Sequence, residues 1–160
     1  MDSSGSQLAS LAPSLLLSSP KRDYRKGEEV IVTVGLANFT PRPLVVNKRL
    51  QMIFDYEYLE AYELGFQIIG PRGTPIAPRM VTEDRLWPYP QPDDFVELLI
   101  GAQWQKEIPL SLYFDLSESG SYEIIAKYHN SHNGHQFGFD AWTGELRSPP
   151  VEVVISEHRF

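Results

Sequence analysis

A histidine-rich segment has residue types and a spacing that could hold a metal ion. It reads His129-Asn130-Ser131-His132-Asn133-Gly134-His135. Asn-Gly is the strongest two-residue signal for a β-hairpin turn, so the segment is predicted to be a hairpin. His132 and His135 would then face each other across the turn, with Cβ atoms about 5 Å apart. Two imidazoles at that distance can share a zinc or copper ion.

The predicted set of metal ligands is incomplete. In a regular strand His129 points to the opposite face, and Asp140 is the nearest carboxylate in the sequence. Structural zinc takes four protein ligands and catalytic zinc takes three. We therefore predict no metal and no cofactor, and interpret the segment as a polar hairpin tip. A metal-dependent enzyme that uses His132, His135 and Asp140 is an alternative interpretation.

A second candidate binding region is the proline-stiffened segment Arg85-Leu86-Trp87-Pro88-Tyr89-Pro90. A rigid, exposed aromatic side chain can stack on a sugar or anchor a protein interface. Alternatively Trp87 folds back over one end of the domain, since large aromatic side chains are usually mostly buried. The predicted ligand-binding residues are thus Trp87, Tyr89, His132 and His135, and the predicted ligand is a protein or a carbohydrate.

Other segments contain only part of the motif that a calcium-binding or phosphate-binding loop requires. Asp93, Asp94 and Glu97 lack the regular spacing of a calcium-binding loop. Gly70-Pro71-Arg72-Gly73 lacks the following lysine and the helix of a phosphate-binding loop. Asn38-Phe39-Thr40 matches a glycosylation acceptor, which matters only if a eukaryotic cell secretes the chain. We predict no catalytic centre.

The composition of the chain excludes several classes of partner. Its 160 residues carry a net charge of -7, which opposes binding to the phosphates of nucleic acid. No apolar run approaches the roughly 18–20 residues of a membrane-spanning helix, so no membrane insertion is predicted. No positive charge precedes the apolar residues Leu15–Leu17, so we expect no export signal. The absence of cysteine fits both a reducing compartment and export, so the compartment and the oligomeric state stay open.

Hydrophobic residues at a period of two predict strands along most of the chain. The clearest strand is Glu29–Asn38, and after a proline-containing loop Leu44–Val46 is expected to be its antiparallel partner. Turn residues at Gly101-Ala102 predict a hairpin of Phe95–Ile100 with residues 104–112. Further strands are predicted at 13–18, 66–69, 121–128 and 151–155, and a short helix at Phe54–Glu63 with Glu63 facing water.

These elements predict an all-β fold, because many short strands alternate with Gly, Pro and Asn turns and no β-α-β pattern is present. The expected architecture is an immunoglobulin-like, two-sheet antiparallel β-sandwich of about eight strands. Residues 1–22 form an N-terminal tail with a possible first strand, and residues 23–160 form the single sandwich domain. The proline-rich segment 71–92 is expected to be irregular.

Several motifs suggest a family. Asp115-Leu116-Ser117 followed by Gly120-Ser121-Tyr122 resembles the tyrosine corner of immunoglobulin-like sandwiches. Together with Tyr24-Arg25-Lys26-Gly27-Glu28 and Trp142-Thr143-Gly144-Glu145, it resembles the immunoglobulin-like domain that precedes the catalytic domain of deuterolysin-type metalloendopeptidases. The chain is also similar to small intracellular proteinase inhibitors. The resemblance implies the fold, but no His-Glu-x-x-His motif is present, so it does not imply peptidase activity.

The functional expectation is a binding or structural module without enzymatic activity, since sandwiches display loops for recognition on a rigid scaffold. One alternative is a proteinase inhibitor that presents the loop 71–92, because a preordered loop loses less entropy on binding. The metal-dependent enzyme is the other alternative.

Overall fold

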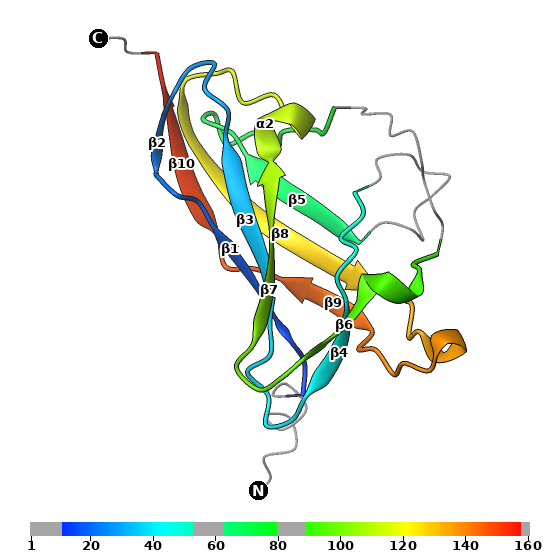
Figure 1. Cartoon of the computed structure of the whole chain (residues 1–160). Coiled ribbons are helices and arrows are strands. Elements are labelled where there is room, and N and C mark those ends of the chain that lie inside the picture. Colours follow the sequence, from blue (N-terminus) through cyan, green and yellow to red (C-terminus); the bar gives the residue numbers. More distant parts are fainter. Residues whose placement is uncertain (1–10, 53–62, 80–88, 158–160) are drawn as a thin grey trace, which may run out of the picture.

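The computed structural model describes residues 11–52, 63–79 and 89–157 (Figure 1). Within these ranges the chain is all-β, as predicted, with several antiparallel sheets as expected of a β-sandwich. Two single turns of 3-10 helix, η2 (Pro92–Asp94) and η3 (His135–Phe137), and one short helix, α2 (Leu110–Tyr113), interrupt the strands. The strands are β1 (Ser14–Ser18), β2 (Asp23–Arg25), β3 (Ile31–Ala37), β4 (Leu44–Asn47), β5 (Leu64–Ile69), β6 (Phe95–Leu98), β7 (Gln103–Pro109), β8 (Gly120–Asn130), β9 (Gly144–Arg147) and β10 (Val151–Ser156).

The strands form two larger sheets and one small one (Figure 1). One sheet has the order β1-β3-β7, the second has the order β2-β10-β8-β5 with β9 beside the end of β8, and β4 pairs with β6. β1 is the strand predicted near the N-terminus. β2 pairs with β10 in parallel, which the sequence did not indicate. The chain therefore contributes β1 to one sheet and then β2 to the edge of the other.

The core lies between the two larger sheets. The period-two pattern of β3 is confirmed, because Val32, Val34 and Leu36 are all fully buried. β8 contributes Tyr122 and Tyr128 to the same core from the opposite sheet, together with the residues between them on that face. Burial of these apolar surfaces provides the main free energy that holds the sheets together.

The corner before β8 has the predicted tyrosine geometry. The Tyr122 hydroxyl donates a hydrogen bond of 2.6 Å to the carbonyl oxygen of Glu118. Gly120 has φ +134°, and a Cβ there would lie 2.5 Å from Cβ of Pro71, so only glycine fits. The neighbouring turn Gly70–Gly73 also forms as predicted, closed by a 3.0 Å hydrogen bond from Gly73 N–H to the Gly70 carbonyl. The corner ties the start of β8 to the turn after β5.

The predicted strand partners were wrong at two places. β4 pairs with β6 and not with β3. β6 and β7 do not form a hairpin, because the turn Gly101-Ala102 leads the chain from the β4–β6 ladder to the β3–β7 ladder. A period of two identifies a strand but does not identify its neighbour, which long-range packing decides. The predicted strand 104–112 also ends earlier, at Pro109, and α2 begins at the next residue, Leu110.

The predicted exposure of Glu63 was wrong as well. Its side chain is only 1% exposed, and the predicted helix Phe54–Glu63 otherwise lies outside the described residues. Buried carboxylates require hydrogen-bond or charge partners. Glu63 has them in the segment after β4, and these contacts belong to the candidate site.

Candidate functional site

Two segments predicted separately as binding regions lie side by side in the structure. The rings of Tyr89 and His132 are 5.8 Å apart and meet edge to face at 85°. The Tyr89 side chain is 60% exposed. The two residues border a cavity of about 130 Å³, which we call the aromatic pocket. Its lining consists of Tyr89, Pro90, Phe95, Ser131, His132, Asn133, Gly134, Gln136 and Phe137.

The predicted Asn133-Gly134 hairpin is absent. β8 ends at Asn130, and the residues that follow form η3 before the chain returns in β9. Gly134 has φ +71°, and a Cβ there would lie 3.1 Å from the Phe95 ring, which stacks on the Phe139 ring at 5.2 Å. Packing of these aromatic rings thus accompanies a helical turn in place of a two-residue hairpin turn. His132 and His135 consequently do not face each other across a hairpin.

His135 lies close to the carboxylate that the metal hypothesis named. Its Nε2 is 3.1 Å from Oδ1 of Asp140, and both side chains are mostly exposed. His132 instead packs against Tyr89. Among the residues that the structure describes, no three His, Cys, Asp or Glu side chains are grouped so that they could hold a metal ion. The arrangement therefore brings together two of the three proposed ligands.

A buried asparagine holds the segment that carries His132. The Asn130 side-chain amide donates hydrogen bonds to the carbonyl oxygens of His132 (2.9 Å) and Trp142 (2.7 Å). Its Oδ1 accepts from the His132 N–H at 3.1 Å. One side chain thus fixes both ends of the connection between β8 and β9. The sequence carried a signal for it, since Asn130 falls on the same face of β8 as the core residues Tyr122 and Tyr128.

A buried ion pair lies beneath Asn130. Asn47 donates from its side-chain amide to Oδ1 of Asn130 (3.1 Å) and to the Glu63 carboxylate. Glu63 also accepts from Arg49 Nε at 2.8 Å and from the Gln51 N–H at 2.8 Å. This network could not be predicted from the sequence, because its members come from separate segments whose contact depends on the fold.

Tyr128 connects this hydrogen-bond network to the hydrophobic core. Its hydroxyl donates a 2.7 Å hydrogen bond to the carbonyl oxygen of Asn47. Burial raises the pKa of the Tyr128 phenol far above its usual value of 10.0, with a further contribution from the negative charge of Glu63. Its ring stacks on Trp142 with centroids 6.3 Å apart. The aromatic pocket is therefore supported from below by a buried, hydrogen-bonded layer.

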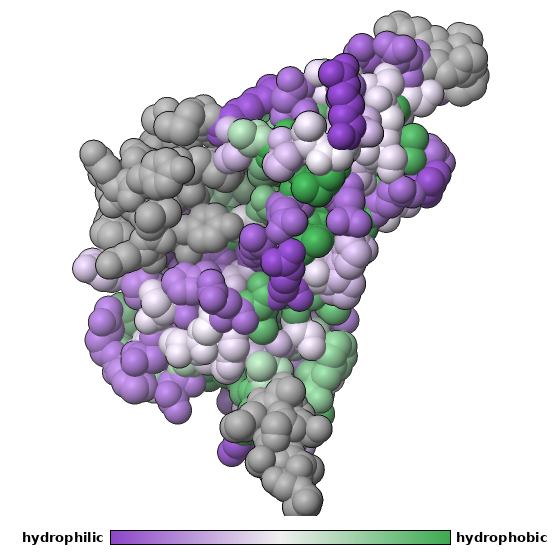
Figure 2. Space-filling view, turned by 180° about the vertical axis from the view of Figure 1, so that it is seen from behind, coloured by the Kyte–Doolittle hydropathy of each residue, from purple (hydrophilic) through white to green (hydrophobic). Residues whose placement is uncertain are grey.

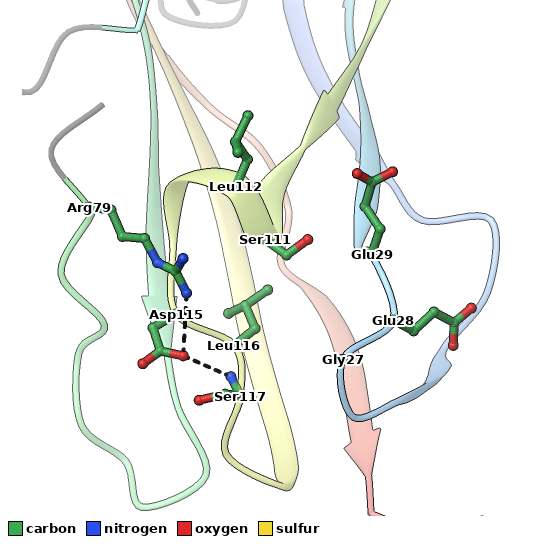
Figure 3. A pocket seen from close by; sticks show the side chains of 9 residues that line it. All are labelled: Gly27, Glu28, Glu29, Arg79, Ser111, Leu112, Asp115, Leu116 and Ser117. Atoms are coloured by element: carbon green, nitrogen blue, oxygen red, sulfur yellow. Dashed lines mark hydrogen bonds and ion pairs between the residues drawn. The ribbon is translucent and has the colours of Figure 1, made fainter. Parts of the chain in front are cut away.

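A larger cavity of about 370 Å³ lies near α2, away from every predicted site residue (Figure 3). Arg79 Nη2 is 3.6 Å from Oδ1 of Asp115, and both side chains are more than half exposed. Hydrogen bonds from the side chain and backbone of Ser117 lower the pKa of the Asp115 carboxyl. We call this cavity, which Glu29, Ser111 and Leu112 also line, the Arg79 cavity.

Trp87 and most of the middle of the predicted inhibitory loop 71–92 lie outside the described residues. The first part of that loop is attached to the domain, since Pro78 forms an isolated bridge with Phe114 and the Arg79 N–H donates to the Tyr113 carbonyl at 2.6 Å. The inhibitor hypothesis stays a prediction.

Comparison of the sequence with known protein families and with curated proteins gave no match. Within residues 11–52, 63–79 and 89–157, no helix is long and apolar enough to cross a bilayer. The candidate site therefore has to be interpreted from its own geometry.

Proposed function

We propose that this chain is a non-catalytic binding module that recognises its ligand at the aromatic pocket. One observation carries the proposal: Tyr89 and His132, about forty residues apart in the sequence, converge on one cavity. Phe95 and Phe137 add aromatic surface to the same lining. The exposed ring of Tyr89, beside the polar groups of the lining, suits ligands that have an apolar face and a polar edge.

The size of the pocket favours a polymeric ligand. About 130 Å³ is below the roughly 300–1,000 Å³ of sites that enclose a complete small molecule. The pocket has room for one unit, such as one sugar of a glycan or one side chain of a protein. Ser131, Asn133 and Gln136 line it with polar groups that can hydrogen-bond to such a unit.

The support beneath the pocket also favours binding. Asn130 fixes the backbone of His132 on both sides, so less conformational entropy remains to be lost when a ligand binds. Catalysis would require a nucleophile or an acid-base pair at the same place. The pair His135 and Asp140 is mostly exposed to solvent. We therefore propose that the pocket binds a ligand and does not catalyse a reaction.

NMR titration of the isotope-labelled protein with a panel of soluble tetrasaccharides and with a panel of short aromatic and proline-containing peptides tests the proposal. We expect one class to shift the resonances of the pocket residues, and Tyr89→Ala to weaken that binding about tenfold, equal to the loss of about 1.4 kcal/mol. The matched control is Leu112→Ala, which removes an exposed side chain from the Arg79 cavity. Equal binding by Tyr89→Ala and the parent, or equal loss in Leu112→Ala, would contradict the proposal.

A further inference from the structure

Three apolar side chains project into solvent from two adjoining loops at one end of the sandwich. Phe39, Leu99 and Ile100 are 62%, 60% and 60% exposed. Phe39 lies in the loop that follows β3, and Leu99 and Ile100 lie in the loop between β6 and β7, at the lower end of Figure 1. We call these three residues the apolar tip. On the face seen in Figure 2, in contrast, hydrophobic residues form small patches between hydrophilic ones.

Backbone hydrogen bonds join the two loops of the apolar tip. The Asn38 N–H donates to the Ala102 carbonyl oxygen at 2.9 Å, and the Gly101 N–H donates to the Asn38 carbonyl oxygen at 2.7 Å. These bonds continue the antiparallel ladder of β3 and β7 beyond the ends of the strands. Phe39 and the pair Leu99 and Ile100 are therefore displayed by one connected piece of backbone.

The Asn38 side chain holds this piece of backbone in place. It is fully buried, and its amide donates to the carbonyl oxygens of Leu98 and Arg42, both at 2.9 Å. Its Oδ1 accepts from the N–H (3.0 Å) and the hydroxyl (2.6 Å) of Thr40. In Asn38-Phe39-Thr40, which matches a glycosylation acceptor in the sequence, the side chains of Asn38 and Thr40 are thus buried and only Phe39 projects into solvent. The fold holds three large apolar side chains in water on a rigid support.

The charge around the apolar tip differs from that of the whole chain. Although the chain has a net charge of -7, the tip loops carry the exposed cation Arg42, whose guanidinium has no ion-pair partner among the described residues. The nearest carboxylate along these loops is Glu97 on β6. Exposed apolar side chains and an exposed guanidinium on the same pair of loops match the groups of a phospholipid layer, where phosphates lie above the acyl chains.

We propose that the apolar tip docks on the surface of a phospholipid bilayer without spanning it. Phe39, Leu99 and Ile100 enter the boundary between headgroups and acyl chains, where their apolar surface leaves water. Arg42 lies at the level of the phosphates and donates hydrogen bonds to them. The remainder of the domain stays in water, so the aromatic pocket is free to bind its own ligand.

The size of the tip favours lipid over a protein partner or a second copy of the chain. Stable protein interfaces bring together about 20–30 residues from each side. The tip offers three apolar side chains on two loops, and a fluid lipid phase needs no complementary shape to receive them. The negative net charge disfavours strongly anionic membranes, so we expect binding to zwitterionic lipid that depends only weakly on salt.

Flotation of the intact chain with phosphatidylcholine vesicles in 150 mM salt tests this proposal. We expect the parent to float with the vesicles, and a triple variant with Phe39→Ser, Leu99→Ser and Ile100→Ser to lose at least about tenfold in partitioning. Arg42→Gln should lose less than the triple variant, because phosphatidylcholine has no net charge and the change removes only the hydrogen bonds that the guanidinium donates to lipid phosphates. Circular dichroism and the melting temperature verify that the variants are folded.

Leu112→Ser is the matched control, because it removes an exposed apolar side chain far from the tip. If the parent does not float, or if Leu112→Ser loses as much as the triple variant, the proposal is wrong. Tip-dependent self-association in sedimentation velocity without vesicle binding would assign the tip to a second copy and overturn it too. Tyr89→Ala should float as the parent does, so failure at the tip and failure at the aromatic pocket are distinguishable.

Discussion

The aromatic pocket and the Arg79 cavity differ in what lies beneath them. The pocket is the smaller of the two, yet its backbone rests on the buried side chains of Asn130, Asn47 and Glu63. The Arg79 cavity has almost three times the volume, but its ion pair between Arg79 and Asp115 is more than half exposed. Volume alone therefore does not identify a preorganised site. Buried polar groups that fix the lining are the more informative sign, because leaving them unsatisfied costs free energy.

The largest expected difference between the two regions is in stability. Glu63→Ala should destabilise the protein by about 3–5 kcal/mol, because it leaves the guanidinium of Arg49 without its buried counter-ion. Asp115→Ala, in the exposed pair, should cost less than about 1 kcal/mol. Urea denaturation of both variants measures these values. Similar losses in the two would show that the Glu63 network is no more important than a surface pair.

A smaller effect is expected where the network meets the pocket. Asn130→Ala should cost about 2–3 kcal/mol, because the three hydrogen bonds that its side chain makes with partly buried backbone groups disappear. It should also broaden the NMR resonances of His132, since the segment after β8 loses its attachment. Ser117→Ala, which removes one hydrogen bond from exposed Asp115, is the control for the Arg79 cavity. The expectation fails if His132 keeps sharp, unshifted resonances in Asn130→Ala.

The smallest expected effect is on the pH dependence of folding stability. Near the aromatic pocket stability is lost at alkaline pH, whereas at the Arg79 cavity it is lost at acid pH. Because the pKa of Tyr128 is raised in the folded state, its contribution to stability is complete below about pH 10 and is lost as the pH rises toward the folded pKa. Tyr128→Phe should lower stability by about 1–2 kcal/mol at pH 7 and reduce the loss above pH 10.

At the Arg79 cavity, we expect the contribution of Asp115 to folding stability to be lost at acid pH. The pKa of Asp115 is lowered, so its contribution is present above the ordinary carboxyl pKa and is lost as the pH falls through the folded value. This contribution is small because solvent screens the exposed carboxylate. Urea midpoints between pH 3 and pH 11 for the parent, Tyr128→Phe and Asp115→Asn test both directions. Identical alkaline slopes for the parent and Tyr128→Phe would remove Tyr128 as the cause.

Most strands could be predicted because their signal is local. The alternation in β3 and β8 is visible in any window of seven residues, and the corner at Gly120 and Tyr122 depends on residues four apart. Tyr89 and His132 could also be named as candidates, since aromatic residues and histidines are recognisable by type. That the two meet over one pocket could not be predicted, because no local pattern specifies a contact between segments forty residues apart.

The errors have a common physical origin. Asn133-Gly134 favours a hairpin locally, but packing of Phe95 on Phe139 accompanies a helical turn. Glu63 has the polarity of a surface residue, but Arg49 and Asn47 make its burial possible. In the first case tertiary packing outweighed a local preference worth only about 1 kcal/mol. In the second, ion pairing and hydrogen bonds offset the much larger cost of burying a carboxylate.

The sequence by itself determined that this protein is all-β, where most of its strands lie and which residue types could bind a ligand, because these properties follow from short-range periodicity and side-chain chemistry. Only the tertiary structure decided that β4 pairs with β6, that Glu63 is buried, and that loops distant in sequence form the aromatic pocket and the apolar tip. Those features depend on which strands become neighbours, and the free energy of packing the whole core makes that choice.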